Sequence, residues 1–501
     1  MTRAARAVGP PGQPLLNEAA WLRGTAGLDE PARLAGDKAA RLALAASAGL
    51  AVLPGWVVPV AEGRPALSAG ATAVRDGRPA AARRAVLGHQ LDDGLAAELR
   101  EAVAGLGGRV IVRSSSPLES DPRWSGAFSS VAEVGPGDVE AAVRSCWASA
   151  FAVDPLGRLE ACGLPPEALE LGVLLQPEIR PLAGGVARVT QAPGGPYGMV
   201  APTTRFVGRG GRNHDQRAAE VTVEGVLGHP GALLSGWAEG ASARVRLLDS
   251  WAEAEPARGR LPAGWQGAGW LPAQDTGRAP GRRDEGGLTG LIGQEMIAAV
   301  AALAARAWRL LGDDVIEWAA DDGGLWLLQS RRSAATAAQV VAEGTTAARV
   351  AGEEVTAGPP TGDTGGGLPT SRARMPLLAA TVLRRGEHVP GRPGAPGMAA
   401  GRLIACRPHE RPAGDCEDAI LLVDRPVPAL APLLFAARGV IARTGAAGSH
   451  LAEVARSLGV PMVLGCRPER VTGGPAVADG AFLAAIDGST GDVALLPAMG
   501  G

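Results

Sequence analysis

Lysine is almost missing from this sequence of 501 residues. Of its 49 basic residues, only Lys38 is a lysine and the other 48 are arginines. Arginine replaces lysine at ordinary surface positions, but its planar guanidinium is too wide where a compact ammonium must touch a single oxygen. The one remaining lysine is therefore a candidate functional residue. The alternative is a chance survivor at a solvated helix start.

Other absences narrow the class of protein. The formal net charge is -2 and no long block of one sign occurs, which argues against nucleic-acid and membrane-surface partners. No run of roughly 18 or more apolar residues is present, so no transmembrane helix is expected. The five cysteines are scattered without a CxxC pair, which suits a reducing cytoplasm and gives no metal-binding signature.

The length of the sequence and the distribution of its glycines and prolines predict its domain organisation. A chain of 501 residues exceeds one hydrophobic core, so two or three domains are expected. Residues 1–29 carry arginines without an apolar core behind them, and we expect a disordered leader rather than a signal peptide. Glycine and proline punctuate residues 336–394 densely, as in a flexible linker.

Local periodicity predicts the main elements. Helical spacing is seen over 33–48, 138–151 and 290–311, buried strands over 109–113 and 171–176, and a hairpin over 315–331. Strands and helices then alternate between 395 and 501, which predicts a small, separate α/β domain.

His450 is the clearest catalytic candidate. Apolar residues at helical spacing after it predict a helix that begins at His450, with Ser449 as N-cap and Gly459 just past its end. Unpaired amides at the start of a helix stabilise a phosphate, and a neutral imidazole near pH 7 can attack phosphorus. The alternative is a histidine that merely caps a helix.

The segment around His450 resembles the phosphohistidine domain of the phosphoenolpyruvate synthase and pyruvate phosphate dikinase family. It reads GAAGSH and then LAEVARSLGVPMVLG, against the family's Gly-rich loop, Thr-Ser-His, and helix that ends in Val-Ala-Arg. Gly448 stands where the family usually has threonine. The resemblance implies that His450 is the catalytic residue and carries a phosphoryl group.

Three other segments resemble the ATP-grasp nucleotide-binding domain with which this family opens. They are GDKAA at 36–40, VIVRSSSPLES at 110–120 and VIEWAADDGGLWLLQSR at 315–331. The resemblance implies ATP as substrate and Mg²⁺ as cofactor. It gives nucleotide-binding roles to Lys38, Arg113, Gln176, Glu317, Gln329 and Arg331, with Glu317 and Gln329 as magnesium ligands.

The nucleotide-site residues are weaker signals when each is taken singly. Glu317 alone could be an exposed strand glutamate, and Arg113 and Arg331 could be surface ion pairs. Lysine and arginine side chains on paired elements would neutralise the transferred phosphoryl group, and two oxygen ligands suit Mg²⁺. Val315 departs from the family pattern, which has an acidic residue two positions before the glutamate, so a metal ligand is expected to be lost or shifted to Asp314.

The resemblance implies a fold of mixed α/β (α+β) type. We expect a leader at 1–29, an ATP-grasp domain at 30–335, a linker at 336–394 and a swivelling phosphohistidine domain at 395–501. None of these four ranges corresponds to the pyruvate-binding barrel of phosphoenolpyruvate synthases. None corresponds to the acceptor domain of the related rifampin phosphotransferase either. The expected partner is therefore an acceptor on a separate subunit.

The sequence supports three functional hypotheses. The first is a cytoplasmic dikinase-type phosphotransferase in which the β-phosphate of ATP passes to His450 and then to an acceptor, with release of AMP and phosphate. The second is a stand-alone kinase for a small alcohol or antibiotic in a biosynthetic cluster. The third is a non-catalytic nucleotide-binding subunit, which the Val315 departure motivates.

Overall fold

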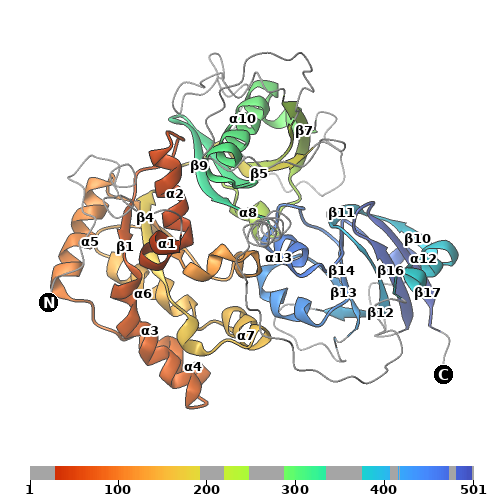
Figure 1. Cartoon of the computed structure of the whole chain (residues 1–501), viewed down its shortest axis with the longest axis horizontal. Coiled ribbons are helices and arrows are strands. Elements are labelled where there is room, and N and C mark those ends of the chain that lie inside the picture. The colour runs from red at the N-terminus through yellow and green to blue at the C-terminus, as the bar shows by residue number, and fades with distance from the viewer. Residues whose placement is uncertain are drawn as a thin grey trace, which may run out of the picture. The chain divides into compact units, whose positions relative to one another are not determined.

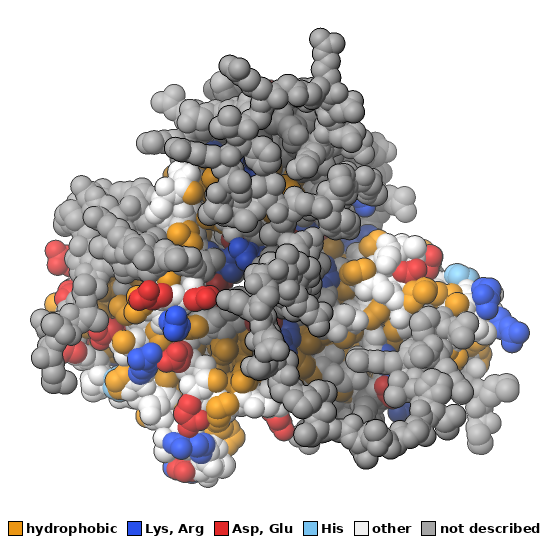
Figure 2. Space-filling view, in the orientation of Figure 1, with side chains coloured by type: hydrophobic (Ala, Val, Ile, Leu, Met, Phe, Trp, Pro, Cys, Tyr) orange, Lys and Arg blue, Asp and Glu red, His pale blue; other side chains and the backbone are white. Residues whose placement is uncertain are grey.

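The structure is a computed structural model that describes residues 29–191, 219–247, 287–333, 375–406, 416, 418–472 and 481–498. The leader expected at 1–29 lies outside these ranges except for its last residue, and residues 336–374 of the expected linker lie outside them as well. None of the described helices is both long and apolar enough to cross a membrane. On the face shown in Figure 2, described acidic and basic side chains are interspersed.

The chain divides into two compact units. The N-terminal unit comprises Met1–Ser120, Gly126–Leu234 and Gly240–Arg331. The C-terminal unit comprises Asp121–Ser125, Ser235–Glu239 and Arg332–Gly501. Both contain helices and sheets, so the mixed α/β class expected from the sequence is confirmed.

A four-stranded antiparallel sheet forms one half of the N-terminal unit. Its strands lie in the order β1-β4-β2-β3. The strands are β1 (Trp56–Val58), β2 (Val110–Ser115), β3 (Val131–Val134) and β4 (Gly172–Pro177). The accompanying helices are α1 (Asp29–Ala35), α2 (Asp37–Ser47), α3 (Val60–Arg75), α4 (Pro79–Leu87), α5 (Asp93–Gly105), α6 (Val139–Ser149) and α7 (Val153–Cys162), with short 3₁₀ turns at η2 (Pro117–Ser120), η3 (Pro122–Trp124) and η4 (Pro166–Ala168).

A five-stranded antiparallel sheet forms the other half of this unit. Its order is β7-β6-β5-β8-β9. The elements are β5 (Ala183–Gln191), β6 (Ala219–Leu227), α8 (Gly231–Leu234), β7 (Ala241–Leu247), α9 (Gly287–Ile292), α10 (Gln294–Leu311), β8 (Val315–Asp321) and β9 (Gly324–Arg331). The apolar face of α10 packs on this sheet and on α2, which confirms the expected helix and hairpin (Figure 1).

The first helix of the unit differs from the sequence expectation. Periodicity predicts one helix over 33–48, but the structure has α1 and α2, broken at Gly36 with a φ of 82°. A side chain at Gly36 would collide with the carbonyl oxygen of Ser115, so only glycine permits this approach of α2 to the end of β2. The break turns the backbone amide of Asp37 toward the carbonyl of Ser116, at 3.1 Å.

The C-terminal unit is built on an eight-stranded mixed sheet, in the order β10-β17-β16-β12-β13-β14-β15-β11. Strands β12 to β15 are parallel and the remaining pairings are antiparallel. The strands are β10 (Glu387–Pro390), β11 (Arg392–Ala395), β12 (Met398–Cys406), β13 (Ile420–Val423), β14 (Gly439–Ala442), β15 (Met462–Leu464), β16 (Phe482–Asp487) and β17 (Asp492–Pro497).

Helices complete this unit. They are α12 (Met375–Arg385), the 3₁₀ helix η7 (Pro428–Phe435), α13 (His450–Leu458) and α14 (Glu469–Thr472). Helix α13 and η7 share one apolar core with β13, β14 and β15, and α12 packs in a separate cluster against β12 and β16 (Figure 1).

Part of the segment expected to be a linker is folded. The glycine and proline content predicts a linker over 336–394, but residues 375–395 form α12, β10 and β11. Both strands pair within the C-terminal sheet, β10 with β17 and β11 with β15. Proline is tolerated at such edge strands because their outward amide groups need no partner. The folded part of the C-terminal unit therefore begins before residue 395.

The cysteines give a first testable prediction. Burial raises the pKa of the Cys146 and Cys466 thiols to about 12, so both stay protonated and unreactive well above neutral pH. Cys406 is also buried, whereas Cys162 and Cys416 are half-buried. In a titration of the native protein with a disulfide reagent at pH 8, we expect only Cys162 and Cys416 to react quickly. Fast modification of Cys146 would contradict the buried position of α6.

Candidate functional site

Lys38 lies at the first turn of α2 with only 6% of its surface exposed. Its ammonium donates to the carbonyl oxygen of Ser114 at 2.7 Å and to Oε1 of Glu119 at 3.2 Å. The other oxygen of Glu119 accepts from the amide of Ser116 at 2.9 Å. The only lysine of the chain is therefore held at the end of β2, beside the Arg-Ser-Ser segment that the sequence singles out. Sequence reasoning missed Glu119, its counter-ion.

Arg113 is the second cation of this group. Its guanidinium donates to Oε1 of Gln176 at 3.0 Å and to the carbonyl oxygen of Leu328 at 2.7 Å. Burial lowers the pKa of Arg113, and the negative charges of Glu317 and Glu119 act in the opposite direction. Arg113 thus joins the end of the four-stranded sheet to strand β9.

Gln176 has its side-chain amide engaged at both ends. Its oxygen accepts from Arg113, and its Nε2 donates to the carbonyl oxygen of Leu53 at 3.2 Å. The residue is 1% exposed. The sequence resemblance implies that Gln176 contacts the nucleotide. In the structure its side chain holds the guanidinium of Arg113.

Glu317 and Gln329 face each other across the β8–β9 hairpin as a directly paired couple. Glu317 is 5% exposed, and its Oε1 has no hydrogen-bond partner among the described residues. Arg331 lies two residues after Gln329 on the same strand, so both side chains leave the strand on one face. A buried carboxylate oxygen without a donor suits an incoming cation.

His229 is a candidate that sequence reasoning missed. Burial lowers the pKa of His229, as does the charge of Arg113, whereas Glu317 and Glu178 raise it. Its Nδ1 accepts from the amide of Gly231 at 3.0 Å, which fixes the ring orientation. The residue stands in a glycine- and proline-rich stretch without periodicity, so no local signal marked it. The side chain is exposed, and its ring lies in the electrostatic surroundings of Arg113 and Glu317.

A buried ionic network secures the hairpin that carries Glu317. Arg41 of α2 pairs with Asp37 at 2.8 Å and with Asp313, just before β8. Asp313 is fully buried and also accepts from the hydroxyl of Ser330 at 2.7 Å. Burial opposes the charge on Arg41, but Asp313 and Asp37 raise the pKa of its guanidinium above the ordinary value. The network ties the lysine-bearing helix to the residue that precedes the hairpin and, through Ser330, to β9.

Lys38→Arg tests most directly whether arginine can replace the only lysine of the chain. The ammonium is enclosed by Ser114 and Glu119, and a guanidinium at the same place would be too wide for this enclosure. We expect the initial rate of protein labelling by radioactive ATP to fall by roughly 10²-fold or more, the scale seen for loss of one preorganised donor. Arg402→Lys, on an exposed position of β12, is the matched control and should label normally.

His450 lies at the first position of α13, after the loop that follows β14, and is half-buried. Ser449 caps the helix by accepting from the amide of Ala452 at 3.4 Å, and Gly459 ends it in the left-handed conformation. These caps confirm the helix start expected from the sequence. The imidazole therefore stands at the carboxyl end of a parallel strand and at the amino end of a helix, where α/β sheets commonly bind ligands.

Two arginines hold the loop in front of His450. Arg456 donates to the carbonyl oxygens of Ala447 at 2.8 Å and Gly394 at 2.6 Å, and it pairs with the buried Glu453 at 2.8 Å. Arg392 of β11 donates to the carbonyl oxygen of Gly445 at 3.1 Å. Because these guanidiniums bind carbonyl oxygens of the loop, they hold its backbone in place. Arg392 was not identified from the sequence, since it lies in the segment expected to be a linker.

Ser125 also belongs to the C-terminal unit and contacts the catalytic candidate. Its Oγ lies 3.1 Å from Nδ1 of His450, within hydrogen-bond distance. Which atom donates depends on the tautomer of the imidazole. A partner on one ring nitrogen selects the tautomer and the ring orientation.

The sequence resemblance agrees with comparisons against known families. Residues 32–239 match the family model of the pyruvate phosphate dikinase AMP/ATP-binding domain, and residues 415–491 match that of the PEP-utilising enzyme mobile domain. No curated protein matches the chain.

Two solved structures are similar to a small part of the chain. The holo-form of aconitase X from Thermococcus kodakaraensis is 17% identical over 22% of this chain and 99% of its own, with a TM-score of 0.18. The solution structure of a UPF0107 protein is 18% identical over 22% of this chain and 99% of its own, with a TM-score of 0.17. Likenesses at these TM-scores carry no weight for fold or function.

The two family models match in the order in which the sequence motifs occur. The first covers Lys38, Arg113 and Gln176, and the second covers His450 with its loop and helix. The chain belongs to the phosphoenolpyruvate synthase and pyruvate phosphate dikinase family, with an AMP/ATP-binding domain followed by a PEP-utilising mobile domain.

Proposed function

We propose that this protein is an ATP-dependent dikinase-type phosphotransferase that works through phosphorylated His450. One ATP and one water give AMP, inorganic phosphate and a phosphoryl group on the histidine, which then passes to an acceptor. The observation that carries the proposal is the gathering of Lys38, Arg113 and Glu317, from three distant segments, in the N-terminal unit, of which residues 32–239 match the AMP/ATP-binding model.

The cationic groups of the N-terminal unit support the donor half of the reaction. Lys38 and Arg113 would neutralise charge that develops on the transferred phosphoryl group. Lys38 is buried and Arg113 is half-buried, and both are already oriented by carbonyl oxygens, so little reorganisation is needed when the nucleotide enters. Arg331 is 5% exposed on the neighbouring strand and would add a third cation.

Glu317 and Gln329 fit the magnesium ion that the family implies. Among the described residues no group of three or more His, Cys, Asp or Glu side chains could hold a metal. Mg²⁺, however, is commonly held by one or two protein oxygens together with phosphate and water. The Oε1 of Glu317, which has no hydrogen-bond partner within the described part of the chain, and the amide oxygen of its cross-strand neighbour offer such a pair. When bound, the ion would neutralise negative charge on the phosphate oxygens.

His450 would act as the nucleophile through Nε2. A hydrogen on Nδ1 that is donated to Oγ of Ser125 would leave the lone pair on Nε2. The amides at the start of α13 would then stabilise the phosphoryl group on the ring. The loop arginines, Arg392 and Arg456, would keep the ring in place through the carbonyls they hold.

Positional labelling of ATP tests the proposal. With β-³²P-ATP and magnesium, we expect acid-labile, base-stable label on the protein and stoichiometric AMP. With γ-³²P-ATP, the label should appear only in inorganic phosphate. Label from the γ position on the protein, together with ADP, would show ordinary kinase chemistry and overturn the dikinase assignment. Binding of ATP without any AMP would favour the non-catalytic hypothesis.

The acceptor is proposed to lie on a separate subunit. The isolated phosphoprotein, freed of nucleotide, should keep its label in the presence of small alcohols and lose it when the partner subunit is added from a cell extract. Transfer of the label to a small alcohol without any second protein would instead identify a stand-alone small-molecule kinase.

A further inference from the structure

A short segment, residues 235–239, belongs to the C-terminal unit although the chain on either side of it does not. Helix α8 ends just before the segment and strand β7 begins shortly after it, and both elements belong to the N-terminal unit. The segment also forms the end of the range that matches the AMP/ATP-binding model. Three of its residues have defined contacts within the C-terminal unit, and all three contacts lie beside the loop that precedes His450.

The first contact is that of Gly236 with Pro426. Gly236 has a φ of 78°, and a Cβ placed on it would lie 2.6 Å from the carbonyl oxygen of Pro426. On the loop before His450, a Cβ placed on Gly445 would lie 2.4 Å from Cγ of the same proline. Glycine allows the backbone to come this close at both places. A shift of residue 236 would therefore move Pro426 against the loop.

The second contact joins Glu239 to the arginine that holds the loop. Oε2 of Glu239 lies 3.3 Å from Nη2 of Arg392, and the same nitrogen donates to the carbonyl oxygen of Gly445 at 3.1 Å. The side chains of Arg392 and Glu239 are 47% and 51% exposed, so water competes for the pair and its strength is that of a surface ion pair. The carboxylate nevertheless favours the orientation in which Arg392 reaches the loop.

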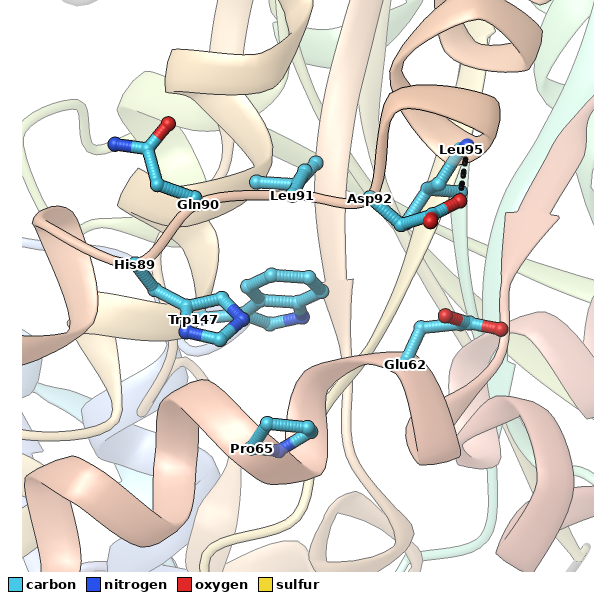
Figure 3. A pocket seen from close by; sticks show the side chains of 8 residues that line it. All are labelled: Glu62, Pro65, His89, Gln90, Leu91, Asp92, Leu95 and Trp147. Atoms are coloured by element: carbon cyan, nitrogen blue, oxygen red, sulfur yellow. Dashed lines mark hydrogen bonds between the residues drawn. The ribbon is translucent and has the colours of Figure 1, made fainter.

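The third contact anchors Trp237. The guanidinium carbon of Arg425 lies 4.3 Å from the centroid of its ring, within the range of a cation–π interaction. Trp237 is 64% exposed, whereas Trp147 is 1% exposed between α3 and the segment that precedes α5 (Figure 3). Burial therefore does little to hold Trp237, and the guanidinium is its main anchor. Because Arg425 directly precedes Pro426, this contact holds the segment at the place where Gly236 meets the proline.

We propose that Gly236, Trp237 and Glu239 are positioning residues for His450. They act through Pro426 and Arg392, which in turn hold the loop that ends at the histidine. The inference rests on the function proposed above, in which His450 receives the phosphoryl group. Because a small misplacement of a reacting group costs much of its rate, a displaced segment lowers the rate of phosphoryl transfer and leaves nucleotide binding unchanged.

Gly236→Ala gives the sharpest test, because its Cβ would collide with the carbonyl oxygen of Pro426. At saturating ATP, the rate constant for labelling by β-³²P-ATP should fall by roughly tenfold or more. The Kd for ATP, measured by calorimetry, should stay within about twofold. Gly77→Ala is the matched control, since Gly77 has a φ of 73° and a Cβ placed there meets nothing within 4 Å. The control should label at the rate of the unsubstituted protein.

Side-chain variants test the other two contacts. Trp237→Ala should slow labelling by about two- to fivefold, and Trp237→Phe, which keeps an aromatic face for Arg425, should restore most of the rate. Glu239→Gln removes the charge that faces Arg392 and should slow labelling by about two- to fivefold, the scale of an exposed ion pair. Glu387→Gln, on an exposed position of β10 in the same unit, is the control and should label normally.

The ring of His450 provides a measurement that does not need phosphoryl transfer. In NMR spectra of protein with ¹⁵N-labelled histidine, the signals of His450 are those that His450→Gln removes. We expect them to shift in Gly236→Ala and to stay in place in Gly77→Ala. If the unsubstituted protein is never labelled by ATP, the phosphotransferase proposal fails, and the spectra still decide whether the segment positions the ring.

Three outcomes would overturn the positioning role. They are a labelling rate of Gly236→Ala equal to that of Gly77→Ala, an ATP affinity that falls by the same factor as the rate, and unchanged His450 signals. Thermal unfolding shows whether each variant is folded. If Gly236→Ala does not fold, the rates and spectra of Trp237→Ala and Glu239→Gln decide the matter in its place.

Discussion

His450→Gln is expected to abolish labelling of the protein by β-³²P-ATP, with a loss of roughly 10³-fold or more, as for removal of a catalytic nucleophile. Glutamine keeps a polar side chain at the start of α13 but has no nucleophilic nitrogen. Because the N-terminal unit does not contain residue 450, ATP affinity measured by calorimetry should stay within about twofold.

A second histidine serves as the control for this variant. His388 lies in the same unit, on β10, and its side chain is exposed. His388→Gln should label as the unsubstituted protein does. If His450→Gln is still labelled, another residue carries the phosphoryl group and the assignment of His450 is wrong.

Arg41→Met is expected to destabilise the N-terminal unit by about 3–5 kcal/mol, the usual cost of breaking a buried ion pair from one side. The substitution removes the guanidinium that pairs with the fully buried Asp313 and the 4% exposed Asp37. Urea unfolding followed by circular dichroism should show the transition of this unit at a lower midpoint. The C-terminal unit, which lacks this network, should unfold as before.

An exposed ion pair provides the comparison. Arg64 and Glu170 pair at 2.9 Å with side chains that are 60% and 35% exposed. Arg64→Met should cost less than about 1 kcal/mol, because water screens such pairs. If Arg41→Met lowers the urea midpoint no more than Arg64→Met does, the buried network contributes no more to stability than a surface ion pair.

Local patterns in the sequence predicted much of the fold correctly. The hairpin over 315–331 and the helix at His450 were expected from a turn, a cap and an apolar period, all within a few residues of one another. The expectation of a linker was wrong for residues 375–394, because their glycine and proline content does not reveal that β10 and β11 pair with strands far along the chain. The break at Gly36 was missed for a similar reason. It is imposed by the close approach of the Ser115 carbonyl, which lies far along the sequence.

The candidate site shows the same division. Motif resemblance brought Lys38, Arg113, Glu317 and His450 forward as candidates, and their roles remain proposals. It could not show that Lys38 pairs with Glu119, or that His229 lies in the electrostatic surroundings of Arg113 and Glu317. Glu119 lies inside the quoted segment 110–120 but was not singled out there, and His229 stands in no pattern whose period or spacing marks it.

The sequence by itself determined the family, the order of the two domains and the histidine at a helix start, because these are written in contiguous motifs. Only the tertiary structure decided which side chains meet. Lys38 reaches Ser114 over 76 positions, and Arg41 reaches Asp313 over 272. Such contacts depend on how two sheets and their helices pack, and a lone lysine becomes a defined ammonium site only when α2 is brought to the end of β2.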